Sequence, residues 1–207
     1  MRPKIIEDLS LPGSDLWVAY TLQSTWRLWN HAESAPFRNT DYQPELTYVM
    51  PRPKSWQDLP LGWKWRMARV GLVHQSHGQT AELSRSWNRV YGVAGFEHDQ
   101  LIATVRVENE LAKTEDHSDD NPDISHYLGR TEVELSWSPG RSMGSMVWRP
   151  SLHGCGSVEL DWTYPVFKDR PDGLRWYVQG FHGYGETLLD YNFKQNSLGA
   201  ALAIFKF

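Results

Sequence analysis

The chain contains almost no cysteine: Cys155 is the only one among its 207 residues. A single cysteine excludes an intramolecular disulfide framework and a cysteine cluster that could hold zinc. Cys155 lies between Gly154 and Gly156, and we interpret it as a small packing residue rather than a nucleophile. Neither disulfides nor cysteine-bound metal are therefore expected to stabilise the fold.

Long apolar runs and clusters of positive charge are also lacking. No stretch of about 18 apolar residues occurs, and the mean hydropathy is −0.56, so a transmembrane helix is excluded. The formal net charge is −4 and no basic run is present, which argues against binding to nucleic acid. Neither absence excludes a transmembrane β-barrel, because its strands alternate lipid-facing and lumen-facing residues.

Aromatic residues are abundant instead, with 11 Trp, 9 Tyr and 7 Phe. Many lie in segments whose apolar and polar residues alternate, such as 133–137, 158–164 and 174–179, and this period of two is typical of half-buried antiparallel strands. The predicted strands lie near 14–28, 43–52, 63–76, 84–96, 99–110, 124–138, 142–150, 155–166, 173–183 and 197–207, and residues 1–9 are a candidate for another. No helix-period stretch or interdomain linker is found, so residues 1–207 are predicted to form one all-β domain.

Two features favour a membrane barrel over a soluble one. Trp and Tyr recur near the ends of the predicted strands, as the aromatic girdles at the membrane interfaces require. These residues are Trp63, Trp65, Trp87, Tyr91, Trp148, Trp162, Tyr164 and Trp176. The last strand ends in Phe207, which resembles the terminal aromatic of bacterial outer-membrane barrels. We predict an antiparallel transmembrane β-barrel, with a soluble sandwich or a lipocalin-like barrel as the alternative.

A candidate catalytic hairpin follows residue 70. Residues i and i+2 of a strand point to the same face, so His74 and Ser76 project together. If the segment forms an antiparallel hairpin centred near Ala81, His74 lies opposite Asn88. All three side chains then continue apolar faces of their strands, and in a membrane barrel the apolar face is the outer wall.

These residue types suit ester hydrolysis. His74 would take the proton of the Ser76 hydroxyl, and Asn88 would hold the imidazole tautomer. A neutral amide orients the ring but does not stabilise an imidazolium as a carboxylate does. The backbone N–H of Gly78 could donate to the oxyanion, and a bound cation could supply the remaining positive charge.

The stretches from His74 to Gly78 and from Ser84 to Arg89 resemble the active-site signature of the outer-membrane phospholipase A family. Further segments resemble the family in the same order: Tyr20-Thr21, Glu33 to Arg38, Tyr42-x-Pro44, Asp119 to Ile124 and Gly183 to Phe193. The resemblance covers the chain from about residue 14 to Phe207. Agreement of several ordered motifs makes it specific.

The resemblance implies a twelve-stranded barrel of the bacterial outer membrane that hydrolyses acyl esters of phospholipids and lysophospholipids, with A1 and A2 activity. It also implies dependence on Ca²⁺ and activation by formation of a homodimer. Carried over residue by residue, Ser76 is the nucleophile, His74 the base and Asn88 the orienting residue. The implied calcium ligands are the Ser84 hydroxyl, the carbonyl of Gln79 and the carbonyl of Ser34 from the partner subunit. The resemblance also implies that Asp120 lies at a calcium site of the monomer. Tyr42 is implied to help line the acyl-chain cleft.

Some positions depart from the family. Gln79 replaces an arginine of the best-known members, which matters little for a main-chain ligand, and His77 replaces a common asparagine. Leu22 replaces a glutamine that bonds across the dimer interface in some members, so a looser dimer is expected. A signal peptide and the family's first strand have no counterpart here, so we expect ten or eleven strands and an N-terminally incomplete barrel.

A non-enzymatic porin-like channel is the main alternative function, and a soluble lipid-binding barrel is the third. A channel needs a wide lumen, whereas about twelve strands enclose a narrow one that side chains fill. We expect the lumen-facing residues Glu132, Glu134, Glu159, Asp161 and Arg175 to form an internal hydrogen-bond network. The remaining histidines show no metal-ligand spacing and are expected in loops or at the rim: His31, His77, His98, His117, His126, His153 and His182.

Overall fold

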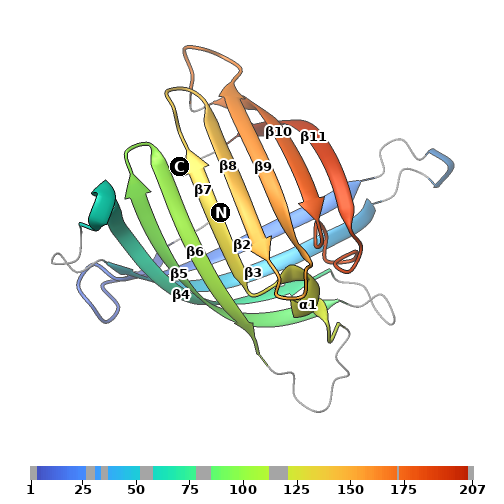
Figure 1. Cartoon of the computed structure of the whole chain (residues 1–207), viewed down its shortest axis with the longest axis horizontal. Coiled ribbons are helices and arrows are strands. Elements are labelled where there is room, and N and C mark those ends of the chain that lie inside the picture. Colours follow the sequence, from blue (N-terminus) through green and yellow to red (C-terminus); the bar gives the residue numbers. More distant parts are fainter. Residues whose placement is uncertain are drawn as a thin grey trace.

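The structure is a computed structural model, and it describes residues 4–26, 31–33, 37–51, 58–77, 85–111, 121–171 and 173–204. These residues contain one antiparallel sheet of eleven strands, in which each strand pairs with its neighbours in sequence (Figure 1). The strands are β1 (Lys4–Glu7), β2 (Asp15–Trp26), β3 (Phe37–Pro51), β4 (Lys64–Ser76), β5 (Ser86–His98), β6 (Leu101–Glu110), β7 (Thr131–Trp137), β8 (Met143–Pro150), β9 (Gly156–Pro165), β10 (Leu174–Gly183) and β11 (Gln195–Ile204). Short helices are η1 (His31–Glu33), η3 (Pro60–Gly62) and α1 (Ile124–Leu128). No helix in the described ranges is long and apolar enough to span a membrane.

The predicted all-β fold is confirmed, and each predicted strand has a counterpart in the sheet. The strand predicted over 124–138 is wrong in its first part, because residues 124–128 form α1 and β7 begins only at Thr131. Gly129 separates them with a φ of 75°, a left-handed conformation that ends the helix. A side chain at Gly129 would also collide with the carbonyl of Pro150, so glycine is required at this turn.

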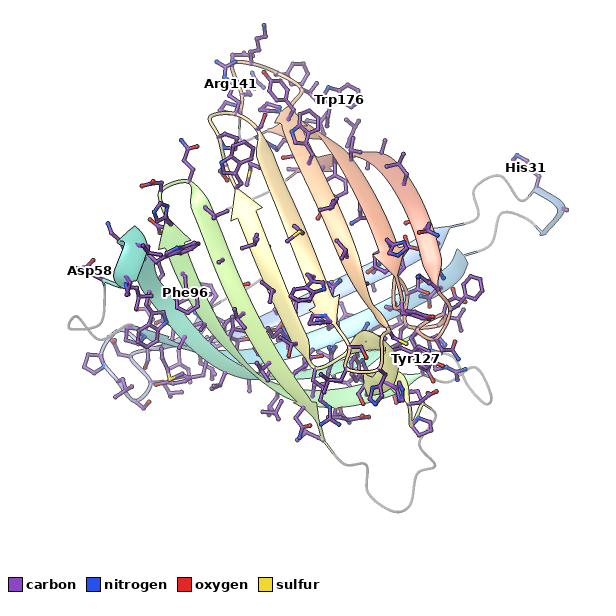
Figure 2. All side chains as sticks on the ribbon, viewed as in Figure 1. His31, Asp58, Phe96, Tyr127, Arg141 and Trp176 are labelled. Atoms are coloured by element: carbon purple, nitrogen blue, oxygen red, sulfur yellow. The ribbon has the colours of Figure 1, made fainter. Side chains whose placement is uncertain are left out.

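The sheet curls into two facing walls. In Figure 1, strands β6 to β11 form the front wall and β2 to β5 pass behind it. Strands β1 and β11 are the two ends of the strand order, so the sheet of the described residues is an open barrel. Figure 2 shows Asp58, Phe96, Arg141 and Trp176 toward one end of the barrel, and His31 and Tyr127 toward the other. Strand β4 runs toward the end that carries α1.

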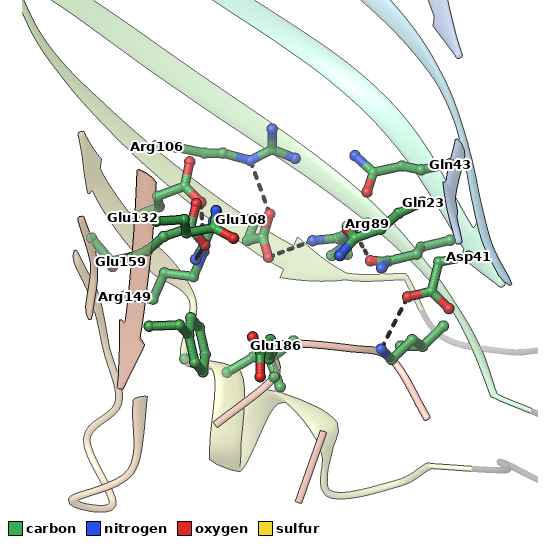
Figure 3. A pocket seen from close by; sticks show the side chains of 18 residues that line it. Gln23, Asp41, Gln43, Arg89, Arg106, Glu108, Glu132, Arg149, Glu159 and Glu186 are labelled. Carbon is green, nitrogen blue, oxygen red and sulfur yellow. Dashed lines mark hydrogen bonds and ion pairs between the residues drawn. The ribbon is translucent and has the colours of Figure 1, made fainter. Parts of the chain in front are cut away.

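The wall is apolar outside and polar inside, the reverse of a soluble barrel. Leu72, Leu160 and Trp176 are exposed on the outer face. Inside, charged groups pair: Arg149 Nε lies 2.8 Å from Glu132, and further contacts are visible in Figure 3. Other members of the predicted lumen network are also bonded, since Tyr177 donates to Asp161 (2.5 Å), Arg175 to Thr163 (3.0 Å) and Ser136 to Glu134 (3.2 Å). This polarity is the one that a lipid-facing wall requires.

The aromatic-girdle prediction holds for only part of its residues. Trp148, Trp162 and Trp176 are exposed on the outer face, as predicted. Trp87 and Tyr91 were wrongly included, because each is only 2% exposed and faces the interior. Both lie in β5 at positions that alternate with the outward Asn88, so strand geometry places them on the lumen side.

A small apolar cluster closes one end of the interior. Trp87, Ile124, Leu188 and Tyr191 pack together there and are almost fully buried. The hydroxyl of Tyr191 donates a hydrogen bond to Asp123, and burial together with this bond raises the pKa of Tyr191, so the phenol stays protonated. The cluster ties α1 and the segment before β11 to the start of β5, and thereby braces the end of the barrel where the candidate catalytic residues of β4 and β5 lie.

Candidate active site

The ladder between β4 and β5 brings two of the predicted catalytic residues together. Its register pairs His74 with Asn88 and Ser76 with Ser86, which is the pairing that a hairpin centred on Ala81 requires. The register is specific because a slip of one residue would turn the apolar outer positions of the slipped strand into the lumen. His74 and Ser76 lie two residues apart on β4 and therefore share its outer face.

Asn88 orients the imidazole of His74. The ring Nδ1 lies 2.8 Å from Asn88 Oδ1. An amide oxygen only accepts hydrogen bonds, so Nδ1 carries the proton and Nε2 carries the lone pair. A ring held in this tautomer presents Nε2 as a base on the outer wall, where Asn88 is exposed.

Ser76 lies in a row of outward residues that crosses several strands. Across β3 and β4 it pairs with Tyr42, and Tyr42 pairs in turn with Leu22 across β2 and β3. Both neighbours are exposed, Leu22 at 56%. The structure therefore places Tyr42 and an apolar wall beside the serine.

A buried network supports the hairpin from the lumen side. Gln75 lies between the two catalytic candidates in sequence and points inward, where its Oε1 accepts hydrogen bonds from Trp87 Nε1 (3.1 Å) and Arg89 (2.9 Å). Arg89 also pairs with Glu108 on β6 at 3.0 Å, and its guanidinium stacks 3.9 Å from the centre of the Trp87 ring. Figure 3 shows Arg89 joined to Glu108 of the neighbouring strand inside the lumen. Strands β4, β5 and β6 are thus fixed to one another behind the site.

Replacing Gln75 with leucine is expected to destabilise the barrel by about 1.5–3 kcal/mol, because the buried Arg89 loses an acceptor that the new side chain cannot supply. We also expect a severalfold fall in kcat, since Gln75 positions the strand that carries both catalytic candidates. Unfolding in denaturant, followed by tryptophan fluorescence in detergent, measures the first effect. Gln43→Leu is the control, because Gln43 lines the same lumen but makes no side-chain hydrogen bond to any described residue. Equal losses in the two variants would contradict the positioning role.

The remaining predicted site residues lie outside the described residues. These are Gly78 for the oxyanion and Ser84, Gln79, Ser34 and Asp120 for calcium. Within the part of the chain that the structure describes, no group of three or more His, Cys, Asp or Glu side chains could hold a metal ion. The predicted donors are mainly hydroxyl and carbonyl oxygens, which suit a hard cation such as Ca²⁺.

Comparison with known proteins gives the family. Residues 1–204 match the family model described as phospholipase A1. The chain belongs to the phospholipase A1 family. It is 42% identical over 204 residues to a candidate phospholipase A1 of Neisseria meningitidis serogroup B, covering 97% of this chain and 52% of the relative. It is 34% identical over 197 residues to phospholipase A1 of Escherichia coli K12, covering 93% of this chain and 63% of that protein. The chain therefore spans between half and two thirds of these relatives' length.

Solved structures of the family have the same fold. The outer-membrane phospholipase of Salmonella typhi, a dimer with bound calcium, superposes with a TM-score of 0.87 at 32% identity, over 97% of this chain and 74% of that one. Outer-membrane phospholipase A of Escherichia coli gives the same values. An active-site mutant of the E. coli protein, in which an asparagine is replaced by alanine, also has a TM-score of 0.87, at 31% identity. This phospholipase A1 family member is thus an outer-membrane β-barrel protein.

Two arrangements near the rim were not predicted from the sequence. One is the inner network around Gln75. The other is a hydrogen bond between His182 Nδ1 and Asn196 Oδ1, across β10 and β11. His182 was expected in a loop or at the rim, and it lies within β10 close to the strand end. The spacing of 14 residues, the same as between His74 and Asn88, is the signal that could have revealed the second pair.

Proposed function

We propose that this chain is a calcium-dependent phospholipase of the outer membrane that hydrolyses acyl esters of phospholipids and lysophospholipids, at both the A1 and A2 positions. The observation that carries the proposal is the hydrogen bond from His74 to Asn88 on a wall that faces lipid. His74 lies two residues from Ser76 on the same face of β4. A base in a fixed tautomer beside a hydroxyl has little structural purpose on a lipid-facing surface. A membrane lipid brings its ester carbonyl to that surface.

The reaction would proceed in two steps on Ser76. In the first, His74 Nε2 takes the hydroxyl proton while Oγ attacks the ester carbonyl, and the tetrahedral intermediate expels the lysophospholipid alcohol as His74 returns the proton to it. In the second, His74 deprotonates a water molecule that attacks the acyl-serine, and the acyl–Oγ bond breaks to release the fatty acid as His74 returns the proton to Ser76 Oγ. Asn88 keeps Nδ1 protonated throughout, so the same nitrogen serves as base and acid.

The negative charge that develops on the carbonyl oxygen needs hydrogen-bond donors or a nearby positive charge to stabilise it. In the proposed site the backbone N–H of Gly78 supplies one of them. A calcium ion held by Ser84, by the carbonyl of Gln79 and by Ser34 of the partner subunit would supply positive charge there when bound, and Asp120 would serve a calcium site in the monomer. The related S. typhi structure, a dimer with bound calcium, supports this part of the proposal.

The polar interior argues against the channel alternative. Arg89 on β5 pairs there with Glu108 on β6 at 3.0 Å, and Arg106 of β6 pairs with the same glutamate at 3.0 Å. The lumen retains a cavity of about 490 Å³, lined by these and other charged side chains (Figure 3). Filled interiors of this kind are typical of small barrels rather than open porins.

Removing calcium is expected to abolish release of fatty acid from phospholipid micelles. The measurement is fatty-acid release by the refolded chain in detergent, with calcium and with excess EDTA. Ser84→Ala should raise the calcium concentration needed for half-maximal activity by about tenfold or more, since one oxygen ligand is lost. Ser142→Ala, in the turn before β8, is the matched control and should leave the calcium requirement unchanged. Full turnover in excess chelator would rule calcium out, and ion conductance without hydrolysis would favour a channel.

A further inference from the structure

A second cavity, of about 180 Å³, lies on the opposite side of the barrel from Ser76. It is formed by the ends of β8, β9 and β10 and the segment that leads into β11. In Figure 1 these strands belong to the front wall, whereas β4 and β5 lie behind. Trp148, Cys155, His182, Tyr184 and Lys194 contribute to its lining. The proposed hydrolysis uses none of these residues.

The lining carries positive charge and no carboxylate. Its cationic side chains are Arg149 and Lys194. Arg149 is already paired with Glu132 at 2.8 Å and with Glu159 at 3.8 Å. Lys194 is exposed and has no ion pair with any residue that the structure describes. In a chain of net charge −4, a cavity with an uncompensated ammonium group favours an anionic ligand.

His182 faces this cavity in a fixed orientation. Its Nδ1 donates to Asn196 Oδ1, just as His74 bonds to Asn88, so Nε2 is the nitrogen left for a ligand. A phosphomonoester suits this nitrogen because its second pKa lies near 6, so one proton can be shared between a phosphate oxygen and Nε2. A phosphodiester has no such proton to share near neutral pH.

The cavity also lies at the depth of lipid headgroups. His182 pairs with Val158, which pairs with Trp148, and Trp148 is 47% exposed on the outer face, where tryptophan marks the membrane interface. The next outward row toward the membrane contains Gly180, flanked by Leu160 and Leu198. No atom lies within 4 Å of the place where a side chain of Gly180 would begin.

Because Gly180 has no side chain, the outer surface has a shallow depression directly beside the cavity, between two exposed leucines. Leu160 is 54% and Leu198 is 84% exposed. A ligand whose anionic group fills the cavity would have an acyl chain placed on the apolar surface at Gly180. Only an amphiphile makes use of both features.

We propose that this cavity binds the phosphomonoester headgroup of a membrane lipid. Lys194 and His182 hold the phosphate, and one acyl chain lies over Gly180 between Leu160 and Leu198. The site is separate from the catalytic hairpin, so binding requires no ester hydrolysis. It would tether the side of the barrel away from Ser76 to anionic lipid.

Cys155 makes the proposal measurable, because the only cysteine of the chain lines the cavity. The readout is the rate at which iodoacetamide alkylates Cys155 in the refolded chain in dodecyl maltoside micelles. The probe is a dialkyl ether phosphatidic acid, which carries a phosphomonoester and no ester for the enzyme to cleave. We expect this lipid to slow alkylation, whereas a dialkyl ether phosphatidylcholine and inorganic phosphate at the same concentration do not.

Two variants test the two halves of the site. Lys194→Gln should raise the concentration of phosphatidic acid needed to protect Cys155 by about fivefold, the effect of one lysine at a charged membrane surface. Gly180→Leu fills the space proposed for the acyl chain and should also raise the protecting concentration, without changing any charge. Lys168→Gln, on the turn at the far end of β9 and β10, is the control and should keep full protection.

The other outcomes overturn the proposal. Equal protection by phosphatidylcholine would show a site for lipid without regard to the phosphomonoester, and equal protection by inorganic phosphate would show a site for the free anion. The proposal also fails if phosphatidic acid gives no protection, or if it protects both variants as well as the unaltered chain.

Discussion

Replacing Ser76 with alanine is expected to lower phospholipid hydrolysis by at least about 1000-fold, because no other group can take the place of an acylated nucleophile. The barrel should remain folded, since Ser76 is partly exposed on the outer wall. Fatty-acid release measures the loss, and resistance to heat in detergent gels shows that the barrel is intact. Labelling by a sulfonyl fluoride should disappear with the activity.

Ser86→Ala is the matched control for this experiment. Ser86 lies directly opposite Ser76 in the ladder and has the same hydroxyl on the same wall, but it lies diagonally across the ladder from His74 and not on the same strand. We expect near-normal activity in Ser86→Ala. Full activity in Ser76→Ala, or equal losses in both variants, would refute the assignment of the nucleophile.

The other two members of the triad should show a graded loss. His74→Ala removes the base and should cost about 10²- to 10⁴-fold in kcat. Asn88→Ala removes one neutral hydrogen bond, worth about 0.5–1.5 kcal/mol, and should cost about tenfold or less. Asn88→Asp keeps an acceptor for Nδ1 and should retain more activity than the alanine variant. The reverse order of Asn88→Ala and His74→Ala would contradict the proposed roles.

The pairing of His74 with Asn88 could be predicted because it depends on two local rules. Strand residues alternate between faces, and residues equidistant from the centre of a hairpin lie opposite each other. Both rules act within a short segment and need no knowledge of the rest of the barrel. The pair of His182 and Asn196 follows from the same rules only when the connection between β10 and β11 is centred at residue 189, and the strand predicted over 197–207 left Asn196 out.

The inner network could not be predicted in the same way. Arg89 bonds to Gln75 on one neighbouring strand and to Glu108 on the other, so its contacts depend on how far each strand is offset and on the curvature of the wall. Alternation shows that these residues face the lumen, but not which of them meet. Each polar side chain in the lumen has several polar neighbours on adjacent strands, and alternation alone does not show which of them it contacts.

Two errors have simple physical causes. The helix α1 covers only Ile124–Leu128, little more than one turn, which is too short to show a period of 3.6 residues in the sequence. Trp87 and Tyr91 were assigned to the membrane interface by residue type, although their parity relative to Asn88 already placed them inside. Face assignment by parity is the more reliable rule, because backbone geometry enforces it whatever the side chain.

Activity is expected to follow the fraction of protein that is dimeric. The row that contains Leu22, Tyr42 and Ser76 lies open on the outer wall, so one barrel alone offers a single apolar face to a substrate chain. A second copy related by a two-fold axis would turn this face into a cleft with two walls. It would also bring Ser34 of the partner subunit to the proposed calcium site. A monomer would then lack both the cleft and one calcium ligand.

Leu22→Arg tests this dependence. A two-fold interface would bring the two copies of this row together, so Leu22→Arg would place two like charges near each other in the dimer only. A cost of about 2 kcal/mol or more corresponds to a dimer weakened by about 30-fold or more. Specific activity should fall with the dimer fraction measured by sedimentation in a detergent dilution series with calcium present. Leu160→Arg is the control, because Leu160 is exposed to a similar degree (54%) on the far wall, and this variant should keep both dimer and activity. Constant specific activity through complete dissociation to monomer would show that one subunit is sufficient, and the proposed control by assembly would then be wrong.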